Sequence, residues 1–195
     1  AETGEATEVN ETDAATGTSF MVKQGVINWE GTKPVVGTKH TGTVKVKGGE
    51  FKIKDGNIVS GTFNIDMNSI NNEDLADAPG KKEKLEGHLK SPDFFAVDSF
   101  PSASFQITGS EKVEGKEDRT HNISGNLMMR GVKKSITFPA NVKVEGDALM
   151  ASTPKFSIDR TNWGVNFNAS IMNVAKDALI RDDIAVTIEL DATKM

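Results

Sequence analysis

The sequence predicts an all-β fold: an antiparallel β-barrel of about eight strands, with a short helix-and-loop insertion near residues 71–102. Three observations predict it. From residue 18 onward apolar and polar side chains mostly alternate, as in strands that bury one face. Turn signals such as Asp55-Gly56-Asn57 separate the runs at short range. The predicted strands follow one another with mostly local hairpin connections, although residues 71–90 break the alternation, and such a meander favours a barrel over a sandwich.

The first 17 residues, AETGEATEVNETDAATG, contain only one large apolar side chain, Val9. Such a segment buries too little surface to offset its ordering entropy. It is therefore expected to be a disordered acidic tether, with a cloning remnant as the equal alternative. The barrel domain then covers residues 18–195.

The first clear strands lie on either side of the turn at 55–57. Val44 and Val46 alternate with lysines over 42–47, and the pattern resumes over 51–54. Residues 58–67 return with apolar side chains on one face. Gly48-Gly49 is interpreted as a turn, because no helix and no Lys-Ser/Thr pair follows it, as a phosphate loop would require.

Residues 71–90 predict a short helix. Pro79 stands near its first position, and Leu85 and Leu89 form one apolar stripe. This helix is expected to pack across an end of the sheet.

A cluster of phenylalanines follows the helix, after a Ser-Pro-Asp turn. Phe94, Phe95, Phe100 and Phe105 lie within twelve residues. These rings need apolar surroundings, either a packed core or a hydrophobic ligand held inside it. The insertion is therefore expected to be either a plug or a gate at one end of the barrel.

Alternation then predicts the remaining strands at residues 103–113, 121–130, 134–145, 148–158 and 182–192.

Charge and composition exclude several classes of protein. Five of the 28 acidic residues precede the first basic one, Lys23, and 28 − 5 leaves 23 acids against 23 bases. A balanced chain of this kind argues against nucleic acid and against an anionic-lipid surface binder. The absence of cysteine excludes disulfides, thiolate nucleophiles and Cys-type zinc sites. No apolar run approaches the roughly 20 residues of a membrane span and no signal-peptide pattern opens the chain, so a soluble, trimmed mature form without a transmembrane segment is expected.

The chain offers no recognisable catalytic or metal-binding pattern. Its three histidines, His40, His88 and His121, lie in different elements, and none has the spacing of a metal site. His88 is interpreted as a packing or capping residue. An enzyme acting on a lipid would need His88 or His121 close to an Asp or to Arg160. We therefore expect no catalytic residues, no metal and no required cofactor.

Several motifs match a known family in order. They are 28–33 (NWEGTK) with 40–42 (HTG), 61–70 (GTFNIDMNSI), 88–95 (HLKSPDFF), 100–105 (FPSASF), 124–127 (SGNL) with 130–134 (RGVKK), 136–140 (ITFPA) and 156–165 (FSIDRTNWGV). On these motifs, over about residues 18–192, the chain resembles the YceI-like family of bacterial polyisoprenoid-binding proteins. Met128 and Asn166 depart from the family pattern, and Asn166 is expected to affect the cavity mouth.

The resemblance implies an extended lipocalin-like barrel that holds a polyisoprenoid, a quinone tail or another long-chain lipid as its ligand. It also implies a periplasmic or secreted bacterial protein, with the N-terminal segment as a candidate membrane tether. Whether the protein forms a homodimer stays open.

Alternation and the family motifs together define the expected ligand-binding residues. These are Val44, Val46, Phe51, Ile53, Phe63, Ile65, Phe94, Phe95, Phe105, Ile107, Leu127, Met129, Ile136, Phe138, Phe156, Ile158, Arg160, Trp163, Ile184 and Val186.

Two arginines have alternative interpretations. Arg160 is expected to clasp the barrel rim through charge-assisted hydrogen bonds, with binding of a lipid headgroup as the alternative. Arg130-Gly131 is expected to be a solvated hairpin turn.

The leading hypothesis is non-enzymatic lipid binding, storage or transport. Its alternative is a structural or stress-response barrel with a filled core. A continuous apolar cavity of several hundred Å³ would favour the first.

Overall fold

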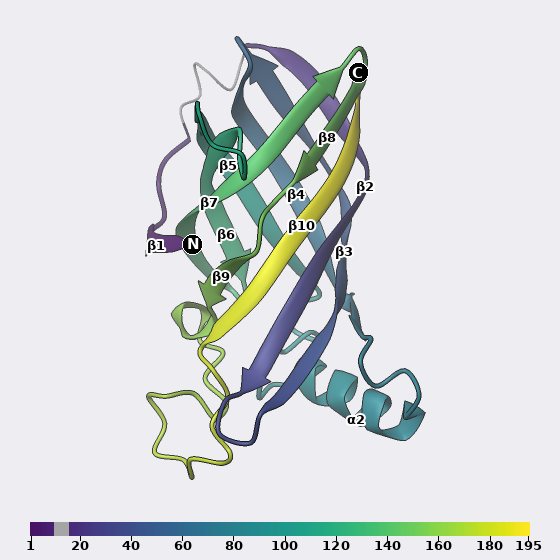
Figure 1. The fold of residues 1–195 in the computed structure, drawn as a ribbon, viewed down its shortest axis with the longest axis vertical. Helices are drawn as coiled ribbons and strands as arrows, with labels where there is room; N and C mark the ends of the chain where they lie inside the picture. The colour runs from purple at the N-terminus through teal and green to yellow at the C-terminus, as the bar shows by residue number, and fades with distance from the viewer. Residues whose placement is uncertain (10–15) are drawn as a thin grey trace.

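Long antiparallel strands wind into a closed barrel, with a helix at one end (Figure 1). The computed structural model describes residues 1–9 and 16–195. The strands are β1 (Glu2–Glu5), β2 (Thr18–Lys33), β3 (Thr38–Lys54), β4 (Asn57–Asn72), β5 (Ser102–Lys112), β6 (His121–Met129), β7 (Val132–Glu145), β8 (Ala148–Ser152), β9 (Phe156–Asp159) and β10 (Asp183–Lys194). The helices are α2 (Pro79–Lys90) and the 3₁₀ turn η1 (Arg160–Trp163).

The barrel closes through β8. The sheet runs β7-β6-β5-β4-β3-β2-β10-β8, and β8 pairs in turn with β7. The predicted antiparallel, lipocalin-like barrel is therefore confirmed. Because β2, β3 and β4 have 16, 17 and 16 residues, they run for about 50 Å each, which makes the barrel long.

The two ends of the barrel differ. One end, here called the α2 end, holds α2, the β2–β3 turn and the irregular segment 164–182 (Figure 1). The opposite end holds the short β3–β4 and β7–β8 turns. The predicted helix is confirmed at Pro79–Lys90, where proline takes an early helical position because its missing N–H costs nothing there.

Two predictions about strand boundaries are wrong. The strand expected over 148–158 is split into β8 and β9 around Pro154, which has no N–H to donate, while Thr153 exchanges two hydrogen bonds with Ile188 of β10. Gly48-Gly49 is not a turn, because it lies inside β3 at an irregularity in the β3–β4 register.

The start of the chain lies along the barrel wall. β1 pairs with the first half of β7, from Glu2–Thr137 to Glu5–Lys134. Further along, the side chain of Asn126 accepts a hydrogen bond from Thr7 N–H at 2.9 Å and donates one to Thr7 O at 2.7 Å. Disorder thus does not hold for residues 2–5, since the free edge of β7 gives these polar residues a hydrogen-bonding partner. Residues 10–15 of the expected tether lie outside the described residues, and the domain boundary stays a prediction.

Candidate ligand-binding site

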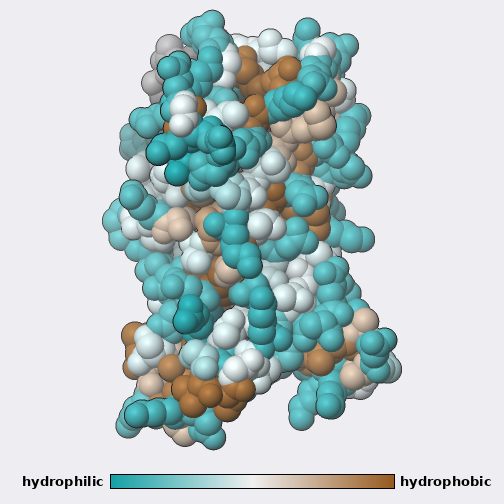
Figure 2. Space-filling model, viewed as in Figure 1, coloured by the Kyte–Doolittle hydropathy of each residue, from teal (hydrophilic) through white to brown (hydrophobic). Residues whose placement is uncertain are grey.

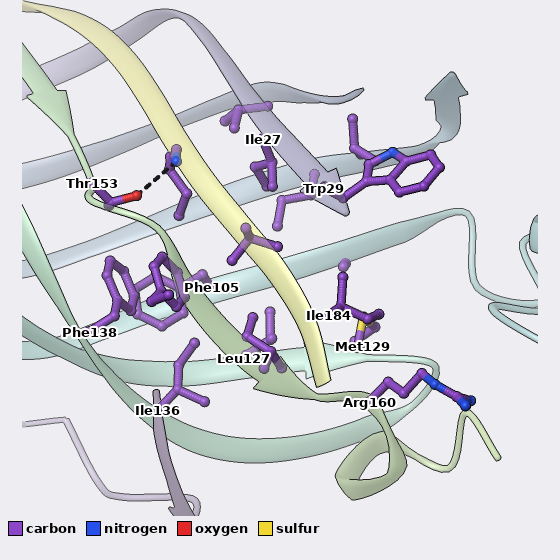
Figure 3. Close-up of a pocket in the computed structure, with 18 of the residues that line it drawn as sticks. Ile27, Trp29, Phe105, Leu127, Met129, Ile136, Phe138, Thr153, Arg160 and Ile184 are labelled. Carbon is purple, nitrogen blue, oxygen red and sulfur yellow. Dashed lines mark hydrogen bonds between the residues drawn. The ribbon is translucent and has the colours of Figure 1, made fainter. Parts of the chain in front are cut away.

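The inside of the barrel is a cavity of about 390 Å³ (Figure 3). Aliphatic and aromatic side chains from every strand except β1 line it. Along β4 the lining extends over thirteen residues, from Ile58 to Ile70, or about 40 Å of strand. At the usual tilt of 35–45° this corresponds to about 30 Å along the barrel axis. The cavity is therefore long and narrow, with the shape of a linear chain.

Most residues expected at the site do line this cavity. The structure brings together Val44, Val46, Phe51, Phe63, Ile65, Phe94, Phe95, Phe105, Ile107, Leu127, Met129, Ile136, Phe138, Phe156, Ile158, Arg160, Ile184 and Val186. They face inward because side chains alternate across a strand, and the inner face of the barrel is the apolar one.

Ile53 and Trp163 do not line the cavity. Ile53 is half-buried near the end of β3, where it packs against the core cluster without being a lining residue. Trp163 is fully buried in η1, and its indole N–H donates to Leu127 O at 3.0 Å. It therefore packs between η1 and the barrel wall, where it has structural contacts only.

Three phenylalanine rings pack on one another in the wall of the cavity. Phe138 stacks on Phe156 at 4.8 Å between ring centroids, and Phe105 lies 5.5 Å from Phe138 (Figure 3). The ring of Phe105 crosses Gly125 of the next strand, where a Cβ would lie 2.3 Å from it. Glycine at 125 thus leaves room for the ring that shapes this part of the wall.

A second cluster covers the α2 end of the cavity. Phe94 lies 5.0 Å from the ring of His88 and 5.2 Å from that of Phe167, which comes from segment 164–182. Buried Val97 anchors the loop in a small core with Met67. The cavity extends up to Phe94 and Phe95, so the insertion covers the end of an apolar space. Of the clustered phenylalanines only Phe100 lies outside the cavity lining, and its ring packs over Gly131.

Arg160 lies at the α2 end of the apolar lining (Figure 3). Its guanidinium donates to three backbone carbonyls: Arg181 O through Nε at 3.2 Å, Val165 O through Nη1 at 2.5 Å and Ile180 O through Nη2 at 3.2 Å. The carboxylate of Asp182 lies 4.0 Å away. Burial lowers the pKa of Arg160, while the charges of Asp182 and Asp159 oppose that effect. These contacts are those of the expected clasp, which ties both ends of segment 164–182 to η1.

The sequence profile of the YceI-like domain matches residues 15–192. The chain belongs to the YceI-like family. Among curated relatives, a UPF0312 protein of Staphylococcus aureus (strain N315) is 28% identical over 147 residues, which cover 68% of this chain and 77% of that protein. Protein YceI of Salmonella arizonae is 36% identical over 106 residues, covering 54% of this chain and 50% of that one.

Solved structures share the fold of this YceI-like chain. BcnA of Burkholderia cenocepacia has 18% identity and a TM-score of 0.59, with 87% of this chain and 96% of that chain covered. A polyisoprenoid-binding domain from Saccharophagus degradans, implicated in plant cell wall breakdown, has 16% identity and a TM-score of 0.61, with 91% and 99% covered.

Several lining residues of the YceI-like barrel were not among the expected ones. Those on strands include Ile27, Trp29, Ile58, Met67, Ile70, Ile123, Val142, Leu149, Ile188 and Leu190, and those in irregular segments or on α2 include Leu85, Leu89, Phe167 and Ile180. The alternation of apolar and polar residues could have identified the lining residues on strands. Phe167 and Ile180 have no such signal, because segment 164–182 has no period.

The expectation of a solvated turn at Arg130-Gly131 is half right. A two-residue turn joins β6 to β7, with positive φ at both residues. The Arg130 side chain, however, donates to Gly164 O at 2.7 Å and to Pro92 O at 2.8 Å. It thereby ties the phenylalanine loop to η1 instead of reaching into solvent.

The two departures from the family pattern lie away from the lining. Met128 is exposed on the outer face of β6, and Asn166 is not a lining residue, although its neighbour Phe167 is. Asn166 Oδ1 is buried without a hydrogen-bond partner among the described atoms.

Each histidine of this YceI-like chain has a polar partner, and His40 and His88 also line the cavity. His40 Nδ1 lies 2.8 Å from Asp74 Oδ2, His88 Nε2 lies 3.3 Å from Asp93 Oδ2, and His121 Nε2 lies 2.9 Å from Gly56 O. Within residues 1–9 and 16–195, no group of three or more His, Cys, Asp or Glu side chains is placed to hold a metal ion. Over the same residues, no helix has the length and apolar character that a membrane crossing requires.

Proposed function

We propose that this protein binds a long apolar lipid, of polyisoprenoid or quinone-tail type, inside the barrel, and stores or carries it without chemical change. The observation that carries the proposal is the continuous cavity of about 390 Å³, lined by apolar side chains over some 30 Å of barrel axis. A structural barrel with a filled core would instead contain scattered small voids.

Burial alone supplies enough affinity for such a ligand. An isoprenoid of roughly 40 heavy atoms that gains about 0.3 kcal/mol per atom binds with about 12 kcal/mol, near the nanomolar range. No charged pocket is needed. The guanidinium of Arg160 lies at the α2 end with its described bonds to backbone carbonyls, so the terminal group of the lipid meets the rim there.

Family membership supports the same ligand class and a location outside the cytoplasm. A relative in fold is a polyisoprenoid-binding domain, and the resemblance to bacterial periplasmic and secreted proteins supports a periplasmic or secreted location. His88 lines the cavity and lies 3.3 Å from Asp93, which is the proximity that an enzyme would need. Family membership and the polyisoprenoid-binding relative in fold nevertheless support binding rather than catalysis.

The proposal is tested by native mass spectrometry and organic extraction of protein isolated from its own host. We expect an added mass that extracts into solvent as a long-chain lipid. Recovery of empty protein alone would contradict the proposal.

A cavity-filling variant gives the matched control. Ile65→Trp places an indole in the cavity from its half-buried lining position, whereas Asn64→Trp places the same ring on the outer face of β4. Titration with dansyl-tagged geranylgeraniol should show weaker binding for Ile65→Trp and unchanged binding for Asn64→Trp. Equal affinities in both variants would argue against binding inside the barrel.

A further inference from the structure

The α2 end of the barrel presents exposed apolar side chains on two separate tips. Val35 and Val36, at the β2–β3 turn, are 58% and 52% exposed, and Ile171 and Met172, in segment 164–182, are 68% and 49% exposed. Figure 2 shows hydrophobic atoms gathered at the lower end of the molecule, where Figure 1 draws these two segments. From this arrangement we propose that the two tips dock the protein on a phospholipid bilayer, so that the cavity opens onto the membrane.

Local hydrogen bonds hold both tips in place. The residue directly before Ile171 is fixed, because the N–H and Oγ of Ser170 both donate to the carboxylate of Asp182. Ile180 N–H closes the base of this loop on Asn168 O at 2.8 Å. Arg181 N–H then donates to Thr32 O at 2.9 Å, which joins the loop to the β2–β3 hairpin. The apolar tips are thus presented by the fold and stand beside each other.

The cavity leads out between the same segments. Its lining includes Lys33 and Thr38 from the hairpin and Ile180 and Arg181 from the loop. Because Thr38 and Arg181 are exposed, the apolar interior reaches the surface at this end. An exposed apolar rim around the opening of an apolar cavity provides a path on which a lipid chain does not meet water.

The charges around the tips fit a bilayer. The chain has 28 acidic residues, yet none lies within 31–39 or within 164–176. The nearest are Glu30, which pairs with Lys39 at 2.7 Å, and exposed Asp177. Those segments carry only Lys33, Lys39 and Lys176 as charged residues. Lysines extend their charges to the headgroups while their methylenes stay in apolar surroundings, whereas a carboxylate at this depth would be costly. With few cations and four apolar side chains, apolar insertion carries the docking, and anionic lipid adds little to it.

This inference rests on the proposed function only for the reason why the protein would dock on a membrane. The docking itself is measured without any bound lipid ligand. The experiment is flotation of the full chain with vesicles of phosphatidylcholine, alone or mixed with phosphatidylglycerol. The test variant carries Val35→Ser, Val36→Ser, Ile171→Ser and Met172→Ser. The control carries Val144→Ser and Met150→Ser, which are 47% and 42% exposed on β7 and β8 toward the opposite end.

We expect the wild type and the control to float with both vesicle types, and the vesicle partition coefficient of the tip variant to fall by about tenfold or more. Affinity for dansyl-tagged geranylgeraniol in solution should be unchanged in the tip variant, because the tips lie outside the cavity. A wild type that floats with neither vesicle type would overturn docking, as would an equal loss in the tip variant and the control. A wild type that floats but takes up no dansyl-tagged probe would support docking and contradict the proposed function.

Discussion

At the scale of single residues, Arg160 has the most informative contacts. Its side chain is 1% exposed, yet its hydrogen bonds go to backbone carbonyls of segment 164–182, while the charges of Asp182 and Asp159 partly balance its own. A long irregular segment needs partners for its carbonyls, and one planar guanidinium supplies several donors at once. Arg160 therefore holds the segment that presents Ile171 and covers the cavity end.

The first prediction concerns this clasp. Arg160→Met should lower the free energy of unfolding by about 3 kcal/mol, because it leaves buried carbonyls without donors. Arg181→Met is the control, since Arg181 takes part through its backbone and its side chain is exposed, and it should change stability by less than about 0.5 kcal/mol. Urea unfolding measures both. Equal effects of the two variants would assign the loss to charge instead of the clasp.

The second prediction concerns pH. Burial alone would raise the pKa of Asp182, but the hydrogen bonds from Ser170 Oγ and N–H and the charge of Arg160 outweigh burial, so the pKa lies below that of an ordinary aspartate. The pKa of Asp74 is also lowered, because hydrogen bonds from Thr41 N–H, His40 and Asn72 outweigh burial. A lowered folded-state pKa gives stability that is full above the unfolded value and is lost as pH falls through the folded value.

Stability should therefore decline as pH falls below about 4, since protonation removes these hydrogen-bonded carboxylates. Asp182→Asn should flatten this decline, and Asp177→Asn, on the same segment and exposed, should leave it unchanged. The measurement is the urea midpoint between neutral and acidic pH. An unaltered slope in Asp182→Asn would show that Asp182 does not contribute.

At the scale of elements, β1 covers part of a seam in the barrel. β8 pairs with β7 only up to Asn141–Ser152, and β9 pairs with β10, so the first half of β7 has a free edge. β1 pairs there, and Asn126 on the outer face of β6 is buried beneath the segment that follows. Unpaired strand edges invite association, which a short polar strand prevents.

The third prediction tests this cover. Asn126→Ala removes both side-chain bonds to Thr7 and should speed amide exchange in residues 1–9, at a cost of about 1 kcal/mol per bond lost. Asn122→Ala, on the same face of β6 at its other end, is the control. Hydrogen exchange read by mass spectrometry separates them. Unchanged exchange in the first peptide would show that β1 alone holds the segment.

The insertion between β4 and β5 raises the question of plug or gate. Phe94 and Phe95 lie at the end of an open cavity. As a gate, the insertion would move and so control how fast a lipid enters and leaves the cavity; as a plug, it would stay in place and only close that end.

The fourth prediction therefore separates equilibrium from rate. Phe94→Ala should speed both uptake and release of dansyl-tagged geranylgeraniol and change its Kd little, because the ring packs on Phe167 and covers the end of the cavity before and after the lipid binds. Phe100→Ala, in the same loop but outside the cavity, should change neither rate. Stopped-flow fluorescence gives both rates. If Phe94→Ala leaves them as in the wild type, the lipid passes elsewhere.

At the scale of the whole molecule, an open cavity makes the free energy of unfolding depend on whether a ligand fills it. Empty apolar space forfeits packing contacts, and a ligand that binds only the folded state adds stability by mass action.

The fifth prediction follows. At a hundredfold excess of free ligand over Kd the gain is about 2.7 kcal/mol, which corresponds to a rise in Tm of roughly 5–10 °C for a chain of this size. Calorimetry of delipidated protein with and without geranylgeraniol measures it. Ile65→Trp should show a smaller rise than Asn64→Trp. An identical Tm with and without ligand would indicate a filled or inaccessible interior.

The sequence by itself determined the barrel, its long strands and most of the inward residues. Alternation is a local property with a period of two residues, so Phe105 and Ile107, or Ile136 and Phe138, could be assigned to one face without knowledge of their neighbours. The helix at 79–90 also had local signals in Pro79 and in its apolar stripe.

Only the tertiary structure decided whether the apolar faces enclose a tunnel or a solid core. The interior volume depends on strand number, tilt and register around the whole barrel, and register shifts such as those in the β3–β4 pairing have no signal in the alternation of the sequence. The contacts of Arg160, Arg130 and Phe167 also could not be predicted from the sequence. Their contacts join segments far apart in the chain, and irregular backbone carries no period from which such contacts follow.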